Sequence, residues 1–211
     1  MQGGLFHKKG AEAELSCILA DSQNALSKKR VPKSYRDAGL DASIRKQRTR
    51  AEAKLLKQAA AVVNAPKIMS VDEEKSEIVM EFITGKPLKE VIEKMPALCV
   101  EAGKCIRKLH DIGIIHGDLT TSNIIFCGEP ESKELSERIA SKGPLFFVDF
   151  GLGFFSKKLE DKATDIVVFK KTFNATHSAM KKGWALVMEG YSPDKGLKER
   201  MKAIEKRARY H

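Results

Sequence analysis

Three polar side chains, in two short motifs, are of the types that hold a metal ion and position a phosphate. Asp118 and Asn123 are five residues apart in the stretch IHGDLTTSNII, which is apolar at both ends. Asp149 follows the apolar run PLFFV and precedes Phe-Gly. Carboxylate and amide oxygens are ligands that Mg²⁺ prefers, and a carboxylate accepts the proton of an attacking hydroxyl group or water. Together the motifs predict phosphoryl transfer from a nucleotide.

This order of motifs is the arrangement with which protein kinases handle ATP. In that arrangement Asp118 orients and deprotonates the attacking group, whereas Asn123 and Asp149 hold magnesium against the phosphates. Taken alone, Asp149 is better explained by a strand that ends in a turn. Its occurrence after IHGDLTTSNII, with strand-like sequence on both sides, favours the catalytic interpretation.

A kinase site also needs a lysine that contacts the phosphates and a glutamate that orients it. Glu52 lies within Asp41 to Val63, where apolar residues recur at helical spacing before a proline; this predicts one long amphipathic helix. Lys28 and Lys29 precede it on a short predicted strand. The residues alone leave Lys28, Lys29 and Lys33 open as partners of Glu52, and they also allow Glu52 to be one more solvated charge.

The elements that would position these residues predict an α+β fold of the two-lobed, protein-kinase-like type with a reduced C-terminal lobe. Residues 1–83 would form the N-terminal lobe, a β-sheet with the long helix, which positions the nucleotide. Residues 84–211 would form a mainly helical lobe with the catalytic and metal-binding loops and a basic tail. We interpret residues 127–144 as a partly helical surface insertion and Trp184 as a core residue.

Several parts of an ordinary kinase are missing. The phosphate loop KKGAEAEL has Gly10 alone where typical kinases have three spaced glycines, so we expect a looser cradle for the phosphates. Gly117 replaces the arginine of His-Arg-Asp, which removes the usual partner of a phosphorylated activation loop. No Ala-Pro-Glu segment follows Gly151, and the 60 residues after it are too few for the usual peptide-docking subdomains.

Positive charge is concentrated in two segments. Residues 28–50 contain nine basic residues against two acidic ones, and residues 195–211 contain seven against two. Clustered positive charge favours a polyanionic partner such as a nucleic acid, although solvated helix faces would explain it equally. Four cysteines without a Cys-x-x-Cys pair predict reduced, mostly buried thiols. No apolar run approaches the ~20 residues of a membrane span, so we expect a cytoplasmic protein, or also a nuclear one in a eukaryote.

The sequence resembles the small atypical kinase/ATPase subunit of the KEOPS (EKC) tRNA-modification complex, a family related to the RIO and aminoglycoside kinases. The motifs that carry this resemblance cover nearly the whole chain. They are GAEA, KSYR, IRKQRTRAEAKLL, MEFITG, IHGDLTTSNII, VDFGL and EDKATDIVVFKKTFNATH.

The resemblance implies a role for each part of the site. Asp118 would be the catalytic base and Lys28 the catalytic lysine, with Asn123 and Asp149 as metal ligands, and ATP and Mg as cofactors. Backbone groups would meet the adenine at the hinge. The implied cofactor-binding residues are Gly10, Ala11, Lys28, Glu52, Glu81 and Ile83.

The resemblance also implies a Mg-dependent ATPase and atypical serine/threonine kinase that supports threonylcarbamoyl-adenosine modification of tRNA. Its partners would be tRNA and the other KEOPS subunits, in particular the threonylcarbamoyl-transferase subunit. No membrane partner is implied. The basic tail would contact tRNA through Lys206, Arg207 and Arg209, although Ala208 departs from the glycine usual in the family. The alternatives are a small-molecule kinase of the aminoglycoside-phosphotransferase type and a nucleotide-binding pseudokinase without turnover.

Overall fold

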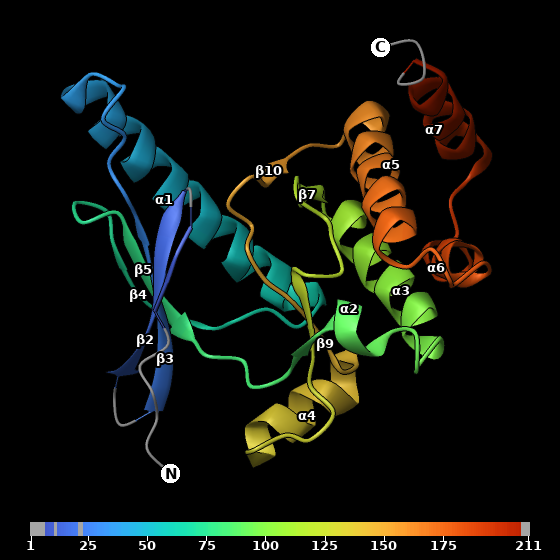
Figure 1. The fold of residues 1–211 in the computed structure, drawn as a ribbon, viewed down its shortest axis with the longest axis horizontal. Helices are drawn as coiled ribbons and strands as arrows, with labels where there is room; N and C mark the ends of the chain where they lie inside the picture. Colours follow the sequence, from blue (N-terminus) through green and yellow to red (C-terminus); the bar gives the residue numbers. More distant parts are fainter. Residues whose placement is uncertain (1–6, 11, 21–22, 208–211) are drawn as a thin grey trace.

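One antiparallel sheet forms most of the N-terminal part of the molecule (Figure 1). The computed structural model describes residues 7–10, 12–20 and 23–207. In those ranges the sheet has five strands, in the order β1-β2-β3-β5-β4. Their bounds are β1 His7–Lys9, β2 Ala13–Ala20, β3 Gln23–Arg30, β4 Ile68–Asp72 and β5 Glu77–Glu81. Because β3 is the middle strand, with β2 on one side and β5 on the other, its inward side chains lie at the centre of the inner face of the sheet.

Helix α1 (Ala38–Val62) crosses beside this sheet (Figure 1). It begins three residues before the predicted start at Asp41, because the Asp37 side chain accepts a hydrogen bond from the backbone N–H of Leu40 at 3.0 Å. Such a cap satisfies a donor that the first helical turn leaves free. The long helix around Glu52 is therefore present, and Glu52 itself is buried.

The C-terminal part is mainly helical. The chain enters it between Glu81 and Lys86, so the predicted boundary after residue 83 falls in this connection and stays a prediction. Its helices are α2 Leu88–Val91, α3 Ala97–Asp111, α4 Lys133–Lys142, α5 Leu159–Thr176, α6 Gly183–Tyr191 and α7 Lys195–Arg207. Its short strands are β6 Lys86–Pro87, β7 Ile114–Ile115, β8 Ile124–Phe126, β9 Leu145–Phe147 and β10 Phe154–Phe155.

Two glycines allow α3 and α6 to pack closely. A Cβ atom on Gly103 would lie 2.1 Å from the carbonyl oxygen of Val187, and one on Gly190 would lie 1.9 Å from the carbonyl oxygen of Val100. Both distances are far below van der Waals contact. The two helices therefore meet backbone to backbone. Trp184 on α6 packs against two buried phenylalanines of α5, as expected for a core residue.

The cysteines are free thiols, as the sequence predicts. Cys99, Cys105 and Cys127 are buried, and Cys17 is half-buried. Burial raises the pKa of Cys99 to about 11 and that of Cys105 to about 12, so both carry a proton at neutral pH. In the described part of the chain, the helices are too short or too polar to cross a bilayer.

Helix α4 is more than surface decoration, because it connects the two parts of the molecule. Its residues are exposed or half-buried. The Arg138 guanidinium donates to both carboxylate oxygens of Glu81 at 2.8 Å and to the carbonyl of Ala65 at 2.7 Å. Lys142 donates to the carbonyl of Ala60, and Lys67 forms an ion pair with Glu134. The insertion predicted at residues 127–144 thus holds the end of α1 and the end of β5.

Replacing Arg138 by alanine is expected to lower the free energy of unfolding by about 1–2 kcal/mol, because three hydrogen bonds to a charged group are lost at a partly exposed site. Urea denaturation measures the effect. Lys133→Ala is the matched control, since Lys133 lies on the same helix with a side chain that is 92% exposed and 4.0 Å from Glu137, its ion-pair partner. Equal stability of the two variants would contradict a connecting role for α4.

Candidate active site

The loop between β7 and β8 carries the predicted catalytic aspartate. The side-chain amide of Asn123 donates to the Asp118 carboxylate and to the Asp118 carbonyl, each at 2.9 Å. Gly117 has φ +79°, and a Cβ atom there would lie 2.3 Å from the carbonyl oxygen of Leu152. Glycine is therefore required at the position where other kinases have arginine, because this loop lies directly against the segment that follows Asp149.

Asp165 on α5 holds the backbone of the catalytic loop, the loop between β7 and β8 that carries Asp118. Its carboxylate accepts the backbone N–H of His116 at 2.9 Å and that of Gly117 at 3.0 Å. It also lies 3.1 Å from Nε2 of His110, whose other ring nitrogen meets the Tyr191 hydroxyl at 2.8 Å. Asp165 is 3% exposed. Sequence reasoning missed this role; the signal was an acid directly before the apolar run IVVF of its helix.

His116 connects the two motifs as a neutral side chain. Its Nε2 lies 3.1 Å from the carbonyl of Val148, and its ring centroid is 4.6 Å from that of Phe150. Burial lowers the pKa of His116 and outweighs the nearby acids. A proton on Nε2 would donate to Val148 and leave Nδ1 to accept from the backbone N–H of Asp118.

Lys28 bridges the two predicted acidic partners. Its Nζ lies 2.6 Å from Oε1 of Glu52 and 2.6 Å from Oδ1 of Asp149. Burial alone would lower the pKa of Lys28, but the two carboxylates raise it above its ordinary value. Burial would likewise raise the pKa of Asp149, and Lys28 holds it below its ordinary value. Lys29 points away and is exposed, so the strand selects Lys28 as the residue that meets Glu52.

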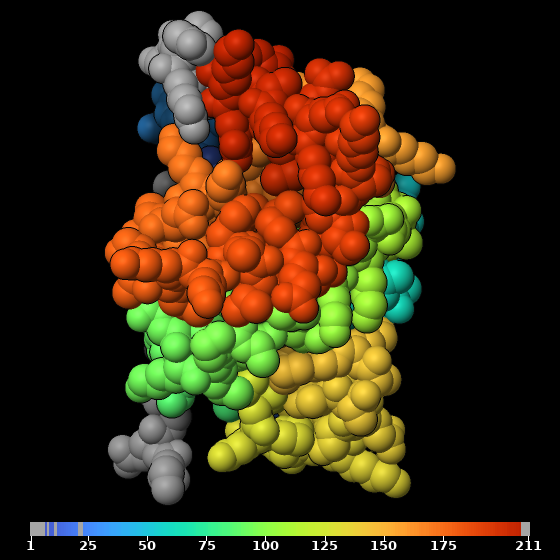
Figure 2. Space-filling model, turned by 90° about the vertical axis from the view of Figure 1, so that its right-hand side faces the viewer, coloured from blue at the N-terminus to red at the C-terminus, as the bar shows by residue number. Residues whose placement is uncertain are grey.

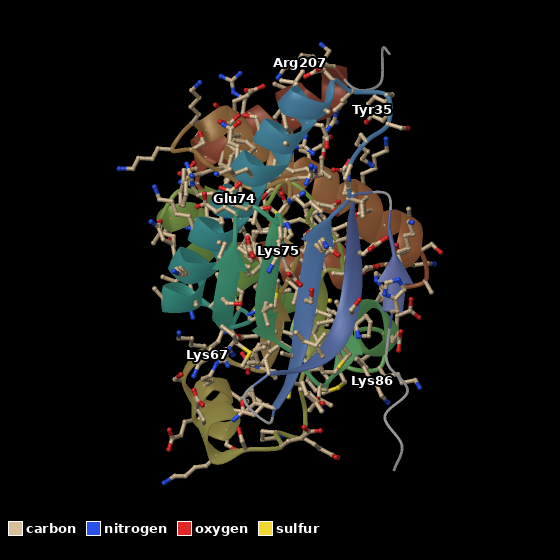
Figure 3. All side chains as sticks on the ribbon, turned by 90° about the vertical axis from the view of Figure 1, so that its left-hand side faces the viewer. Tyr35, Lys67, Glu74, Lys75, Lys86 and Arg207 are labelled. Atoms are coloured by element: carbon tan, nitrogen blue, oxygen red, sulfur yellow. The ribbon has the colours of Figure 1, made fainter. Side chains whose placement is uncertain are left out.

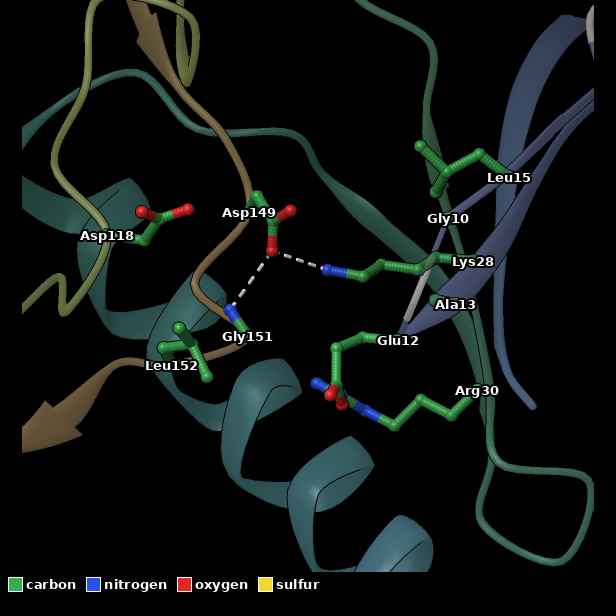
Figure 4. A pocket seen from close by; sticks show the side chains of 10 residues that line it. All are labelled: Gly10, Glu12, Ala13, Leu15, Lys28, Arg30, Asp118, Asp149, Gly151 and Leu152. Carbon is green, nitrogen blue, oxygen red and sulfur yellow. Dashed lines mark hydrogen bonds and ion pairs between the residues drawn. The ribbon is translucent and has the colours of Figure 1, made fainter. Parts of the chain in front are cut away.

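A cavity of about 300 Å³ brings these residues together between the sheet and the catalytic loop (Figure 4). It contains Lys28 from β3 and the carboxylates of Asp118 and Asp149. Gly10 lies on its rim, where its N–H donates to the carbonyl of Ala13 at 2.9 Å. Its lining residues are Gly10, Glu12, Ala13, Leu15, Lys28, Arg30, Asp118, Asp149, Gly151 and Leu152. Sequence reasoning singled out neither Glu12 nor Arg30.

The predicted adenine contacts lie outside this lining. Glu81 ends β5, and Ile83 follows in the connection to the helical part. The Glu81 side chain is held by Arg138 and by the backbone N–H of Lys67 at 3.0 Å. Ala11 is outside the described residues. The hinge contacts of Glu81 and Ile83 therefore stay predictions.

The donor set fits Mg²⁺ bound together with a nucleotide. In the described ranges, no three histidine, cysteine or acidic side chains converge as a metal cage. The site offers instead the carboxylates of Asp118 and Asp149 beside the amide of Asn123. Mg²⁺ keeps several waters and binds through one or two carboxylates and substrate phosphates. Asn123 and Asp149 are thus suitable ligands for a magnesium ion that also binds the phosphates of a nucleotide.

Most of the first basic segment is neutralised within the molecule. Lys28 and Arg30 are buried at the cavity. Three of the other pairs lie at the surface, where Figure 3 labels one acidic partner, Glu74, and Arg45 pairs with the buried carboxylate of Asp41. The pairs are Arg45–Asp41 at 2.7 Å, Arg48–Glu12 at 3.0 Å, Arg50–Glu73 at 2.5 Å and Lys46–Glu74. Internal ion pairs thus offset much of the positive charge of residues 28–50, and a polyanion-binding role for this segment stays a prediction.

The second basic segment remains available on α7. Four lysines share one side of this helix, and its buried side packs on α5 through Leu197 and Met201. These lysines are all exposed and have no ion-pair partner among the described residues. We call them the lysine stripe: Lys195, Lys198, Lys202 and Lys206. The helix lies at the surface shown in Figure 2, in red. Arg207 instead pairs with Glu160 at 2.6 Å, and Arg209 is outside the described residues.

Two solved structures, one of them a kinase, have a similar fold. The Rio2 kinase of Chaetomium thermophilum, in an ADP/Mg²⁺-phosphoaspartate complex, superposes with a TM-score of 0.63 at 16% identity, over 99% of this chain and 71% of that one. WaaP in complex with acyl carrier protein superposes with a TM-score of 0.54 at 14% identity, over 98% of this chain and 88% of that one. These similarities confirm the predicted α+β, protein-kinase-like fold.

Sequence comparison defines the family. The RIO domain profile matches residues 21–131. The KEOPS complex subunit Bud32 of Pyrococcus abyssi is 37% identical over 222 residues, which cover 96% of this chain and 94% of that protein. The chain therefore belongs to the RIO-domain family and, within it, to the Bud32 family, as the motifs predicted.

Some relatives are much longer. A probable bifunctional tRNA threonylcarbamoyladenosine biosynthesis protein of Methanobrevibacter smithii is 41% identical over 209 residues. The match covers 96% of this chain but 36% of that protein. The chain thus spans about a third of the length of this bifunctional relative.

Proposed function

We propose that this chain is an atypical kinase that hydrolyses ATP, with Mg²⁺, in support of threonylcarbamoyladenosine modification of tRNA as a subunit of the KEOPS complex. One observation carries the proposal: Lys28 bridges Glu52 and Asp149 at a cavity shared with Asp118. The names of the Bud32 and bifunctional relatives support the tRNA pathway. They do not favour the alternative of an aminoglycoside-type kinase.

Each residue of the site has a physical role in this proposal. Asp118 accepts the proton of the attacking water or hydroxyl group, and Asn123 holds its carboxylate in place. Lys28 brings positive charge to the phosphates, and Asn123 and Asp149 would hold Mg²⁺. The bound metal supplies neutralisation of the charge on the phosphate oxygens. Asp165 fixes the backbone before Asp118, so the base needs little rearrangement.

We propose water as the main acceptor and serine hydroxyls, including those of the chain itself, as secondary ones. Gly117 excludes the arginine that would order a phosphorylated activation loop. The segment after Gly151 leads through β10 directly into α5, without an Ala-Pro-Glu segment. Little surface is therefore available to hold a peptide, whereas water needs none.

For tRNA we propose contact along the lysine stripe of α7 and onward through the predicted tail residues. Lys206 belongs to both. The exposed ammonium groups can each neutralise a phosphate and release a counterion, which gives affinity without base recognition. The pairing of Arg207 with Glu160 means that tRNA would compete with an acidic side chain at that position.

A comparison of two triple variants tests this function. Replacing Lys195, Lys198 and Lys202 by glutamine is expected to weaken tRNA binding about tenfold or more and to reduce the slope of log affinity against log salt by about 2–3. Stimulation of ATP turnover by bulk tRNA should fall with it, while turnover without tRNA stays at the parent value. Gel shifts at several salt concentrations and a phosphate-release assay measure both.

The control triple variant replaces Lys75, Lys104 and Lys133, which are exposed lysines outside α7. It removes the same total charge and should bind tRNA like the parent. If both variants bound tRNA equally weakly, the loss would be due to net charge and not to the lysine stripe. If tRNA did not change ATP turnover in the parent, a small-molecule kinase would be favoured instead.

A further inference from the structure

Glu52 has a different cation on each of its carboxylate oxygens. Lys28 Nζ lies 2.6 Å from Oε1, and Arg30 Nη2 lies 2.7 Å from Oε2. Lys28 and Arg30 are two residues apart on β3 and so face the same side of the sheet. All three residues are buried, with Glu52 1% and Arg30 4% exposed. The glutamate is therefore doubly paired, whereas the usual kinase arrangement has the lysine alone.

This double pairing changes what Lys28 is free to do. A buried carboxylate that loses its partner is strongly unfavourable. If Lys28 were the only cation beside Glu52, it could not move toward a phosphate without leaving the Glu52 carboxylate less well neutralised. With Arg30 on the second oxygen, Glu52 stays paired when Lys28 moves. Lys28 is also shared with Asp149, so competition for its charge is high.

Arg30 is fixed in place from two sides. Its backbone N–H donates to the carbonyl of Ser76 at 2.9 Å. Its guanidinium reaches the turn after Asp149, because a Cβ atom on Gly151 would lie 3.2 Å from Arg30 Nη2 and 3.3 Å from Lys28 Nζ. Arg30 also lines the cavity in Figure 4. The guanidinium thus lies between the glutamate of α1 and the metal-binding turn.

We propose that Arg30 is a positioning residue, which keeps Glu52 neutralised and oriented through Oε2 so that Lys28 can turn from Glu52 and Asp149 toward the phosphates of a nucleotide. This inference rests on the proposed nucleotide-binding function. Arg30 acts through Glu52 in this proposal and makes no phosphate contact of its own.

The test is a four-variant cycle read by nucleotide binding rather than by turnover. Arg30→Met, Glu52→Gln, their double variant and the parent are titrated with a non-hydrolysable ATP analogue and Mg²⁺ by calorimetry. Arg30→Met should bind at least tenfold more weakly than the parent, because Lys28 becomes the only partner of Glu52. In the Glu52→Gln background the same replacement should change affinity less than threefold. Arg30→Met should also lower the midpoint of unfolding, and the double variant should bring it back toward that of the parent.

Lys29→Met is the matched control, because Lys29 lies between the two residues on the same strand and is exposed; it should bind like the parent. Parent-like binding by Arg30→Met would overturn the inference. A tenfold loss on Arg30→Met that is equally large in the Glu52→Gln background would overturn it too, since it would show a direct contact between Arg30 and phosphate. If neither Arg30→Met nor the double variant folds, the role of Arg30 is to stabilise the sheet, and this outcome would also overturn the inference. Absence of analogue binding in the parent and in Lys29→Met would instead refute the proposed function.

Discussion

Replacing Asp118 by asparagine is expected to lower ATP turnover about a thousandfold, because a positioned carboxylate that accepts a proton contributes about 10²–10⁴ in rate. Affinity for the nucleotide should change less than threefold. The amide has the size of the carboxylate, and its oxygen can still accept the hydrogen bond from Asn123. Steady-state phosphate release and analogue titration measure the two quantities separately.

Asp111→Asn controls for the Asp118 variant, since Asp111 is an exposed aspartate at the end of α3, away from the cavity. Its turnover should equal that of the parent. If Asp118→Asn kept more than a tenth of the parent turnover, Asp118 would not be the proton acceptor. If the parent bound nucleotide without any turnover, the chain would be a pseudokinase.

Replacing Asp165 by alanine is expected to lower the free energy of unfolding by about 4 kcal/mol. The buried backbone N–H of His116, the part-buried N–H of Gly117 and the buried ring of His110 lose their acceptor, and each unsatisfied buried group costs about 1–3 kcal/mol. Turnover of the folded fraction should also fall, because the loop before Asp118 loses its support. Urea denaturation with a phosphate-release assay at low temperature measures both.

Asp161→Ala is the control on the same helix. Its carboxylate accepts one hydrogen bond, from the Ser156 hydroxyl at 2.5 Å, and is only partly buried. We expect a loss of about 1 kcal/mol there. A loss of similar size for Asp165→Ala would show that other groups or water satisfy the catalytic loop.

The residues that sequence reasoning found are those whose chemistry is local to a motif. Asp118, Asn123 and Asp149 are marked by their spacing and by the apolar segments around them. Glu52 was found because a buried-looking acid in a helix needs a cation. These features define a kinase-like fold as well as a site, since the same motifs end strands and begin loops.

The residues that were missed depend on contacts between distant segments. Arg30 looked like one of three adjacent basic residues, and only the register of β3 separates it from exposed Lys29; the two-residue period of a strand could have indicated this. Asp165 meets His116 across 49 positions. The basic residues of α1 pair with acidic residues that are distant in the sequence, such as Glu73 between β4 and β5. A charge count along one segment does not include these partners.

The crossing of α3 and α6 at Gly103 and Gly190 limits where the molecule can flex. No side chain separates the two backbones there, so neither helix can rotate or slide without forcing main-chain atoms into each other. The pair α3 and α6 is therefore a rigid unit within the helical part. We expect any closure around a nucleotide to leave this pair unchanged and to move the five-stranded sheet instead.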